Sequence, residues 1–304
     1  MTRRRSRNRG GIPIFLAVGA GAVLAWWCRR SPSPPAPAEP PRVEQRTPAA
    51  PTAVIRPEAT ARKRDRAKTP ADFEPAGERH GLLAVVLDDM GYDPSAITRL
   101  ASFQLPLALS VIPTSPHVRE ASALARDKGW DLMVHLPMSP EIGAGEQGAI
   151  GPQDDDRAIT VRVNEALDRV PGALGVNNHQ GSRASADARV ARAVLAAVKP
   201  RGLFFLDSRT SAATVLESEA RAMGVPALSR DVFLDDAATE AASPGGAAEA
   251  LDAAWKKALD TVARKGACVV IGHPHRATLD FLAARLPALK AAGITAVRVS
   301  ELVD

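Results

Sequence analysis

Short apolar runs alternate with segments of helical periodicity from residue 81 onward, and this rhythm restricts the fold more than any other feature. The apolar runs have the length of buried strands, and the segments between them repeat apolar residues at helical spacing. The expected strands are Leu82–Leu87, Leu107–Ile112, Leu132–His135, Leu174–Val176, Leu203–Leu206, Val225–Leu228 or Val232–Leu234, Cys268–Ile271 and Ile294–Val299. Nearly continuous apolar strands are typical of a parallel sheet that helices cover on both faces.

Seven or eight strand–helix units of this kind predict an α/β fold, either a βα barrel or an open doubly wound sheet. The barrel is favoured because no G-x-G-x-x-G or P-loop sequence directly follows any of the apolar runs. Residues 81–304 are therefore expected to form a βα barrel domain.

Side chains suited to catalysis or metal binding follow these apolar runs, at the point where each run ends. They are Asp88 and Asp89, His135, Asn177 to His179, Asp207 to Arg209, Asp235 and Asp236, and His273 with His275. The carboxyl ends of parallel strands open on one face of a barrel, which is where active sites lie. Residues from the whole segment are therefore predicted to meet at one site.

Carboxylates beside histidines predict a particular chemistry. Zinc binds imidazole nitrogen and carboxylate oxygen, and a catalytic zinc keeps one position open. A second carboxylate can take a proton from water, and a histidine can protonate a leaving group. This combination favours metal-assisted hydrolysis of an amide or an ester. Structural explanations compete with it, since adjacent aspartates such as Asp88 and Asp89 also cap helices and a lone histidine can be a core residue.

Two other classes of protein remain open on these residues. A metal-dependent phosphoesterase would use the same residue types, although the arginines near the strand ends that could bind phosphate are few: Arg183, Arg209 and Arg276. A glycan-binding or envelope-scaffold protein could use the same barrel without catalysis.

Six short motifs occur in order along the barrel segment. They are LDDMG at 87–91, HLPM at 135–138, NNHQGS at 177–182, FLDS at 205–208, VFLDD at 232–236 and GHPH at 272–275. This series resembles the divergent polysaccharide deacetylase family, a relative of the NodB-type carbohydrate esterases, over residues 81–304. The resemblance implies a distorted βα barrel of the glycoside hydrolase/deacetylase type. It also implies a zinc-dependent hydrolase that removes N-acetyl groups from an envelope polysaccharide of the peptidoglycan type.

The resemblance assigns metal and base roles to four residues. Asp88 would be the catalytic base and Asp89 a ligand of Zn²⁺ or another divalent metal. The wider NodB family takes two histidine ligands from one His-x-x-x-His segment, and this chain has no such spacing near His135. His135 and His179, from two different strand ends, would replace that pair. This departure is the reason to keep a catalytically inactive glycan-binding protein as the alternative.

The remaining roles are also implied by the resemblance. The general acid would be His273 or His275, which lie on one short loop. Asn178, Asp207 and Arg209 would contact the substrate, and Asp207 could instead orient one of the histidines.

The first eighty residues have a different character. Residues 1–10 contain five arginines, residues 11–28 form an uncharged apolar run, and residues 29–80 include eleven of the 25 prolines. The apolar run is just long enough to span a membrane, and arginines before it favour a cytoplasmic amino end. This predicts a single-pass inner-membrane anchor, a disordered linker over 29–80 and a periplasmic barrel. A cleaved signal segment is the alternative.

The charge is divided unevenly between these two parts. Residues 1–80 hold 16 Lys and Arg against 7 Asp and Glu, whereas residues 81–304 hold 23 against 27. The barrel segment is slightly acidic and fits poorly against a phosphate backbone, so nucleic acid is not an expected partner.

Overall fold

The computed structural model of the protein describes residues 81–236 and 246–303. The predicted basic segment 1–10, apolar run 11–28 and linker 29–80 lie outside these residues. Among the helices that the structure describes, none combines the length and apolar character needed to cross a membrane.

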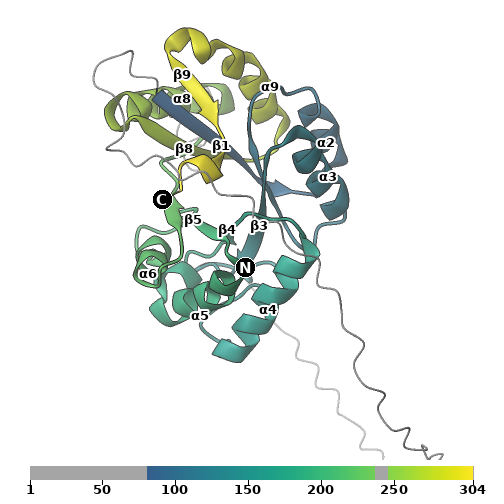
Figure 1. The fold of residues 1–304 in the computed structure, drawn as a ribbon, viewed down its shortest axis with the longest axis vertical. Coiled ribbons are helices and arrows are strands. Elements are labelled where there is room, and N and C mark those ends of the chain that lie inside the picture. The colour runs from purple at the N-terminus through teal and green to yellow at the C-terminus, as the bar shows by residue number, and fades with distance from the viewer. Residues whose placement is uncertain (1–80, 237–245, 304) are drawn as a thin grey trace, which may run out of the picture. The chain divides into compact units, whose positions relative to one another are not determined.

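Nine strands and seven α-helices make up the two described segments (Figure 1). The strands are β1 (Gly81–Met90), β2 (Ala108–Val111), β3 (Asp131–Met138), β4 (Gly175–Gln180), β5 (Phe204–Asp207), β6 (Ala227–Ser229), β7 (Val232–Phe233), β8 (Ala267–Gly272) and β9 (Ile294–Val297). The helices are α2 (Pro94–Leu100), α3 (Val118–Lys128), α4 (Asp156–Arg169), α5 (Ala188–Val198), α6 (Leu216–Ala222), α8 (Gly246–Lys265) and α9 (Arg276–Arg285).

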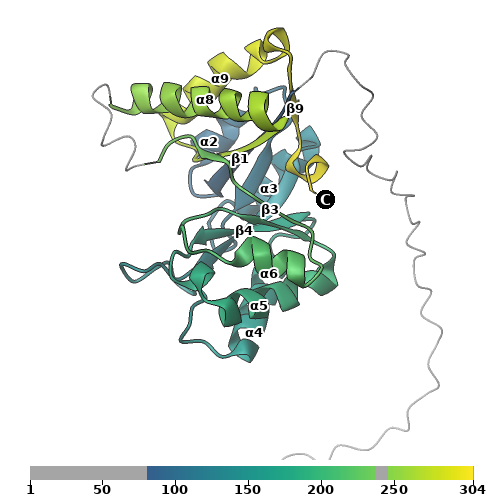
Figure 2. The ribbon, with the colours of Figure 1, turned by 90° about the vertical axis from the view of Figure 1, so that its left-hand side faces the viewer.

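The strands form one sheet in the order β6-β5-β4-β3-β2-β1-β8-β7, and β9 pairs with the first part of β1. All the pairs within the described segments are parallel, as predicted. Figure 2 shows α4, α5 and α6 on the side of β3 and β4, with α8 and α9 beyond β1. The alternating strands and helices of the sequence thus produce the predicted α/β architecture.

The barrel is open between β6 and β7. The sequence predicts a strand at either Val225–Leu228 or Val232–Leu234, but each region contributes a short strand, so the described residues form nine strands rather than seven or eight. Only two residues separate β6 from β7. The first, Arg230, donates its backbone N–H to Asp207 of β5 at 3.0 Å, and the next donates to Val269 of β8 at 2.9 Å. The chain therefore crosses from one edge of the sheet to the other, and no ladder joins these edges among the described residues.

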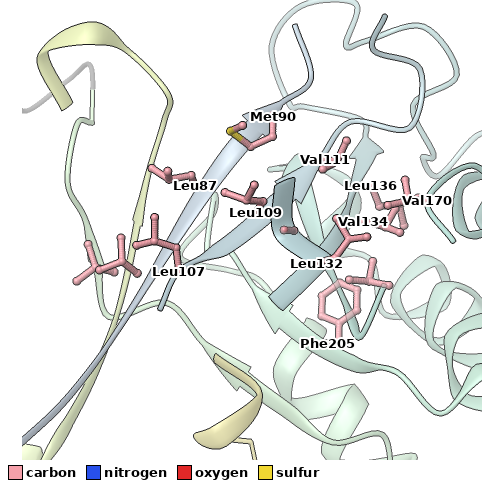
Figure 3. Close-up of a cluster of buried hydrophobic side chains, with 14 of the residues drawn as sticks. Leu87, Met90, Leu107, Leu109, Val111, Leu132, Val134, Leu136, Val170 and Phe205 are labelled. Atoms are coloured by element: carbon pink, nitrogen blue, oxygen red, sulfur yellow. The ribbon is translucent and has the colours of Figure 1, made fainter. Parts of the chain in front are cut away.

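The two faces of the sheet bury different clusters. Side chains at every second position, such as Leu83, Val85 and Leu87 of β1, pack with helix residues in a large core, part of which is drawn in Figure 3. The positions between them, such as Ala84 and Val86, face a smaller cluster built mainly from other strands. This alternation follows from the two-residue period of a strand, and it decides which polar side chains reach the inside of the barrel.

The chain itself covers the amino ends of the strands. Val299 belongs to the inner cluster, and Leu302 and Val303 pack against it. At the start of β3, buried Asp131 accepts hydrogen bonds from the backbone N–H and the hydroxyl of Ser300, at 2.7 and 2.9 Å. Burial raises the pKa of Asp131, although these hydrogen bonds act against that shift. The inner face is thus closed at this end.

Candidate metal centre and active site

Polar residues continue the inner face of the sheet at the carboxyl ends of the strands. Asp88 follows Ala84 and Val86 on β1, and His135 follows Met133 on β3. β1, β3 and β4 run on to Met90, Met138 and Gln180, so their polar residues stand inside the strands and not directly after them as predicted. His273 does directly follow β8, as predicted. In β3 and β4 the apolar run of the sequence ends where the side chains become polar, but the backbone pairing between the two strands continues beyond that point.

Asp89 reaches the same site through an irregularity in β1. By simple alternation it would share the outer face with Leu87, but the register against β2 shifts between Leu87 and Met90. Asp89 also has a φ of 52°, a left-handed conformation that is uncommon for a residue other than glycine. A bulge redirects side chains in this way. The competing explanation, a helix cap, does not hold for this pair, because Asp93 caps α2 through the N–H of Ser95.

Three potential ligand atoms converge in front of β1, β3 and β4. Oδ1 of Asp89 lies 3.1 Å from Nε2 of His135 and 2.9 Å from Nδ1 of His179, and the two nitrogens are 3.2 Å apart. Buried Oδ1 has no aligned hydrogen bond from any described residue, despite these short distances. Ligand atoms about 2.0–2.1 Å from a tetrahedral zinc ion lie about 3.3 Å from one another. The triangle therefore fits one divalent ion.

Hydrogen bonds orient the two imidazole rings toward this point. Nδ1 of His135 donates to Oδ1 of Asn177 at 2.8 Å, and the amide group of Asn177 donates to Oδ1 of Asp88, also at 2.8 Å. On the other ring, Nε2 of His179 lies 3.0 Å from Oε2 of Glu146. A ring nitrogen that donates leaves its partner nitrogen free as a ligand. The free nitrogens are then Nε2 of His135 and Nδ1 of His179.

The two aspartates of β1 have different electrostatic environments. Burial raises the pKa of Asp88, whose Oδ2 lies 3.5 Å from Nε2 of His135. Burial also acts to raise the pKa of Asp89, but the short polar contacts with His135 and His179 outweigh it and hold that pKa below its usual range. For His135, burial acts to lower the pKa, and the nearby charge of Asp88 outweighs it and raises the pKa. Asp89 is thus the more acidic carboxylate of the two, and Asp88 is the more basic one.

A second histidine and carboxylate pair flanks this centre. Asp235 accepts hydrogen bonds from Nδ1 and the backbone N–H of His273, at 2.9 and 2.8 Å, and from the hydroxyl of Thr278 at 2.7 Å. Burial acts to lower the pKa of His273, but its hydrogen bond to Asp235 and the charge of that carboxylate raise it to about 9. Nε2 of His273 lies 3.9 Å from Oδ2 of Asp89. His273 could therefore donate a proton beside the candidate centre.

His275 occupies a different environment from His273. Its ring lies 5.7 Å from that of His273, but the residue is exposed and stands at the start of α9. A ligand atom of His275 also comes within 4.8 Å of ligand atoms on Asp235 and His273. The oxygens of Asp235 already accept three hydrogen bonds, so this second group lacks the unpaired oxygen that marks the first.

The three residues predicted to contact substrate lie at the ends of β4 and β5. Asn178 is buried and bonds to Gln180, Thr210 and the N–H of Ser208. Asp207 accepts from the N–H of Arg209 at 2.8 Å and from Thr214 at 2.9 Å, and among the described residues its hydrogen bonds reach no histidine. Burial raises the pKa of Asp207. Arg209 is exposed.

Sequence reasoning missed three residues of this region. Glu146 lies in the loop after β3, away from any strand end. Asp235 follows an expected strand, and the sequence indicates no role for it. Arg230 donates to the carbonyl of Ser208 at 2.7 Å, and its guanidinium lies 3.9 Å from the centre of the Phe233 ring. Burial lowers the pKa of Arg230, and the charge of Arg209 adds to that shift.

Comparisons with known proteins agree with this architecture. Residues 85–303 match the model of a family described as divergent polysaccharide deacetylase. The chain is 33% identical over 225 residues to the uncharacterized protein YibQ of Escherichia coli K12, covering 74% of this chain and 68% of YibQ. It is also 33% identical over 205 residues to an uncharacterized Haemophilus influenzae Rd protein, covering 67% and 70%. The crystal structure of the uncharacterized protein ATU2773 from Agrobacterium tumefaciens C58 shares the fold, with 21% identity and a TM-score of 0.67 over 75% of this chain and 91% of that one.

Proposed function

The chain belongs to the divergent polysaccharide deacetylase family, and we propose that it is a metal-dependent hydrolase that removes N-acetyl groups from an envelope polysaccharide of the peptidoglycan type. The observation that carries this proposal is the buried Oδ1 of Asp89, which lies between two imidazole nitrogens without an aligned hydrogen bond from the described residues. A buried anionic oxygen in this position needs a cation.

Asp89, His135 and His179 would hold the metal, with zinc the first candidate because the donor set is two imidazoles and one carboxylate. When bound, such an ion lowers the pKa of water and polarises a carbonyl oxygen. The donors come from different strands, so the missing His-x-x-x-His spacing does not argue against a metal centre.

The chain's own residues would handle the protons. Hydrolysis adds water across the amide bond, forms acetate and releases a free amine. Asp88, whose pKa is raised by burial, would accept the proton of the attacking water. His273, held by Asp235 and protonated at neutral pH, would donate from Nε2 to the nitrogen as the C–N bond breaks.

The test uses the purified full chain with N-acetylated glycan oligomers. We expect about one zinc ion per chain and release of acetate that stops on chelation and returns with added zinc. The double variant His135→Ala, His179→Ala should lose both, whereas His275→Ala should keep the metal. Stoichiometric metal without acetate release from any N-acetylated glycan would instead favour the alternative of a glycan-binding protein.

We further propose that residues 11–28 anchor the protein in the inner membrane and that residues 29–80 tether a periplasmic barrel. The arginine-rich start, the uncharged run and the proline content support this arrangement. The protein should stay in the membrane fraction after carbonate extraction, and a reporter fused after residue 303 should be active only in the periplasm. A mature chain that begins after residue 28 would show a cleaved signal instead.

A further inference from the structure

We propose that Glu146, held by Tyr92, is a positioning residue that presents Nδ1 of His179 to the metal. The inference rests on the proposed function, because it concerns the same metal centre. It adds a residue that lies outside the six sequence motifs and in a loop without regular structure.

The ring of His179 contacts a different carboxylate through each of its two nitrogens. Nδ1 of its ring lies 2.9 Å from Oδ1 of Asp89, whereas Nε2 on the other side of the ring lies 3.0 Å from Oε2 of Glu146. The remaining oxygen of Glu146 accepts a hydrogen bond from the hydroxyl of Tyr92. One oxygen of Glu146 thus contacts the imidazole of His179, and the other contacts Tyr92 in the loop after β1.

The contact with Glu146 determines which nitrogen of the His179 ring carries the proton. A neutral imidazole has one donor and one acceptor nitrogen, and a carboxylate can only accept. Glu146 therefore draws the proton to Nε2, and Nδ1 keeps a lone pair that faces Asp89 and His135. Partners of this kind fix the tautomer and the orientation of metal-binding histidines.

The two histidine ligands therefore depend on different partners. His135 is held by the neutral amide of Asn177, inside the barrel. His179 is held by a carboxylate that reaches in from a loop, with its side chain 21% exposed. We expect the loop contact to be the weaker support and the one that can be altered without disturbing the core.

The backbone of the loop after β3 holds Glu146 in this position. Its ends are held at β3, since the N–H of Ser139 donates to Ile150 at 2.8 Å and that of Ile150 donates to Pro137 at 3.0 Å. Gly145 comes directly before Glu146 with a φ of 69°, and a Cβ there would lie 2.8 Å from Cδ of Pro140. Gly145 therefore allows the tight turn that points Glu146 inward.

The test measures metal affinity in the full chain with Zn²⁺ and a competing chelator, and records the visible spectrum of the Co²⁺ form. Glu146→Ala should weaken affinity about 10- to 100-fold and change the Co²⁺ spectrum. Glu146→Gln keeps an acceptor for the imidazole, so it should restore much of the affinity. Tyr92→Phe should have a smaller effect than Glu146→Ala.

Glu141→Ala is the matched control, because it removes the same charge from the same loop while the contact of Glu141 with Ser182 uses only its backbone N–H. Thermal melting checks that each variant is folded. Equal affinity for Glu146→Ala and Glu141→Ala would overturn the inference and leave the proposed function standing. A wild-type chain that binds neither ion would overturn both.

Discussion

Buried carboxylate oxygens are hydrogen-bonded differently at the two ends of the sheet. At the amino ends, both oxygens of Asp131 accept hydrogen bonds from Ser300. At the carboxyl ends, Oδ1 of Asp89 is also buried but lies between two imidazoles with no aligned donor among the described residues. The first arrangement pairs both oxygens, and the second leaves one oxygen without a partner among the described residues. We infer that the amino ends of the sheet serve stability, whereas the proposed function places metal binding and catalysis at the carboxyl ends.

Backbone conformation marks the same difference. Three residues other than glycine have positive φ in the described segments, and they are Asp89, Gln180 and Arg209, all at carboxyl ends of strands. Such conformations cost free energy and cluster at functional sites. Variants at the two ends should therefore separate activity from stability.

The largest effect is expected at the carboxyl ends, from Asp89→Asn. The amide cannot supply the negative charge that a divalent ion needs, so bound metal should be lost and acetate release should fall to the level of metal-free protein. The free energy of unfolding of the metal-free chain should fall only slightly. The lowered pKa of Asp89 means that its charge favours the folded state, but its side chain is 33% exposed, so solvent screens that effect. Metal analysis and urea unfolding of the same samples check this. A large loss of stability in the metal-free variant would break the comparison.

His273→Gln should have the next largest effect. Losing a general acid typically lowers the rate about 10²- to 10⁴-fold, and the metal should remain because its three donors are untouched. The measurement is kcat for acetate release at equal zinc content. His275→Ala is the control, since His275 is exposed and should change kcat much less. Similar losses in the two variants would mean that the second histidine also takes part.

Asp131→Ala should produce the reverse pattern at the amino ends. The backbone N–H of Ser300 would lose its buried acceptor, which costs about 1–3 kcal/mol of the free energy of unfolding. Metal content and kcat of the folded fraction should stay unchanged. Urea unfolding gives the first quantity and acetate release the second. A loss of kcat in fully folded Asp131→Ala would show that the two ends are coupled.

The smallest effect concerns pH. Burial raises the folded-state pKa of Asp131 above its ordinary value of 3.8, so protonation favours the folded state. The stabilisation is fully present below that ordinary value and is lost as pH rises through the folded-state pKa. Compared with Asp131→Asn, the wild type should therefore gain free energy of unfolding as pH falls from 7 toward 4. Unfolding curves for both proteins at several pH values measure this difference, and a gap that widens in the other direction would refute it.

Much of this site could be predicted from the sequence because strand ends meet in a parallel sheet. Asp88, His135, His179 and His273 all lie at ends of expected strands, and the structure brings them together. The two-residue alternation explains why Asn178 and Asp207 do not join them, since they share the outer face with Val176 and Phe205. That face could have been inferred from strand register.

Other features depended on tertiary structure and gave no sequence signal. The inward turn of Asp89 requires the register shift against β2, which depends on how two strands pair. Glu146 reaches His179 from a loop, and nothing in the residues around it marks one acidic side chain among several. The pairing of Asp235 with His273 joins two strand ends that are 38 residues apart.

The closure of the amino ends by residues 299–303 also sets an order of assembly. The last strand, β9, pairs with the first, and Ser300 binds a carboxylate 169 positions earlier in the chain. A polypeptide that emerges amino end first, from a ribosome or a translocation channel, leaves the inner apolar cluster uncovered at this end until residues 299–303 have followed. Apolar surface that is exposed during folding promotes aggregation.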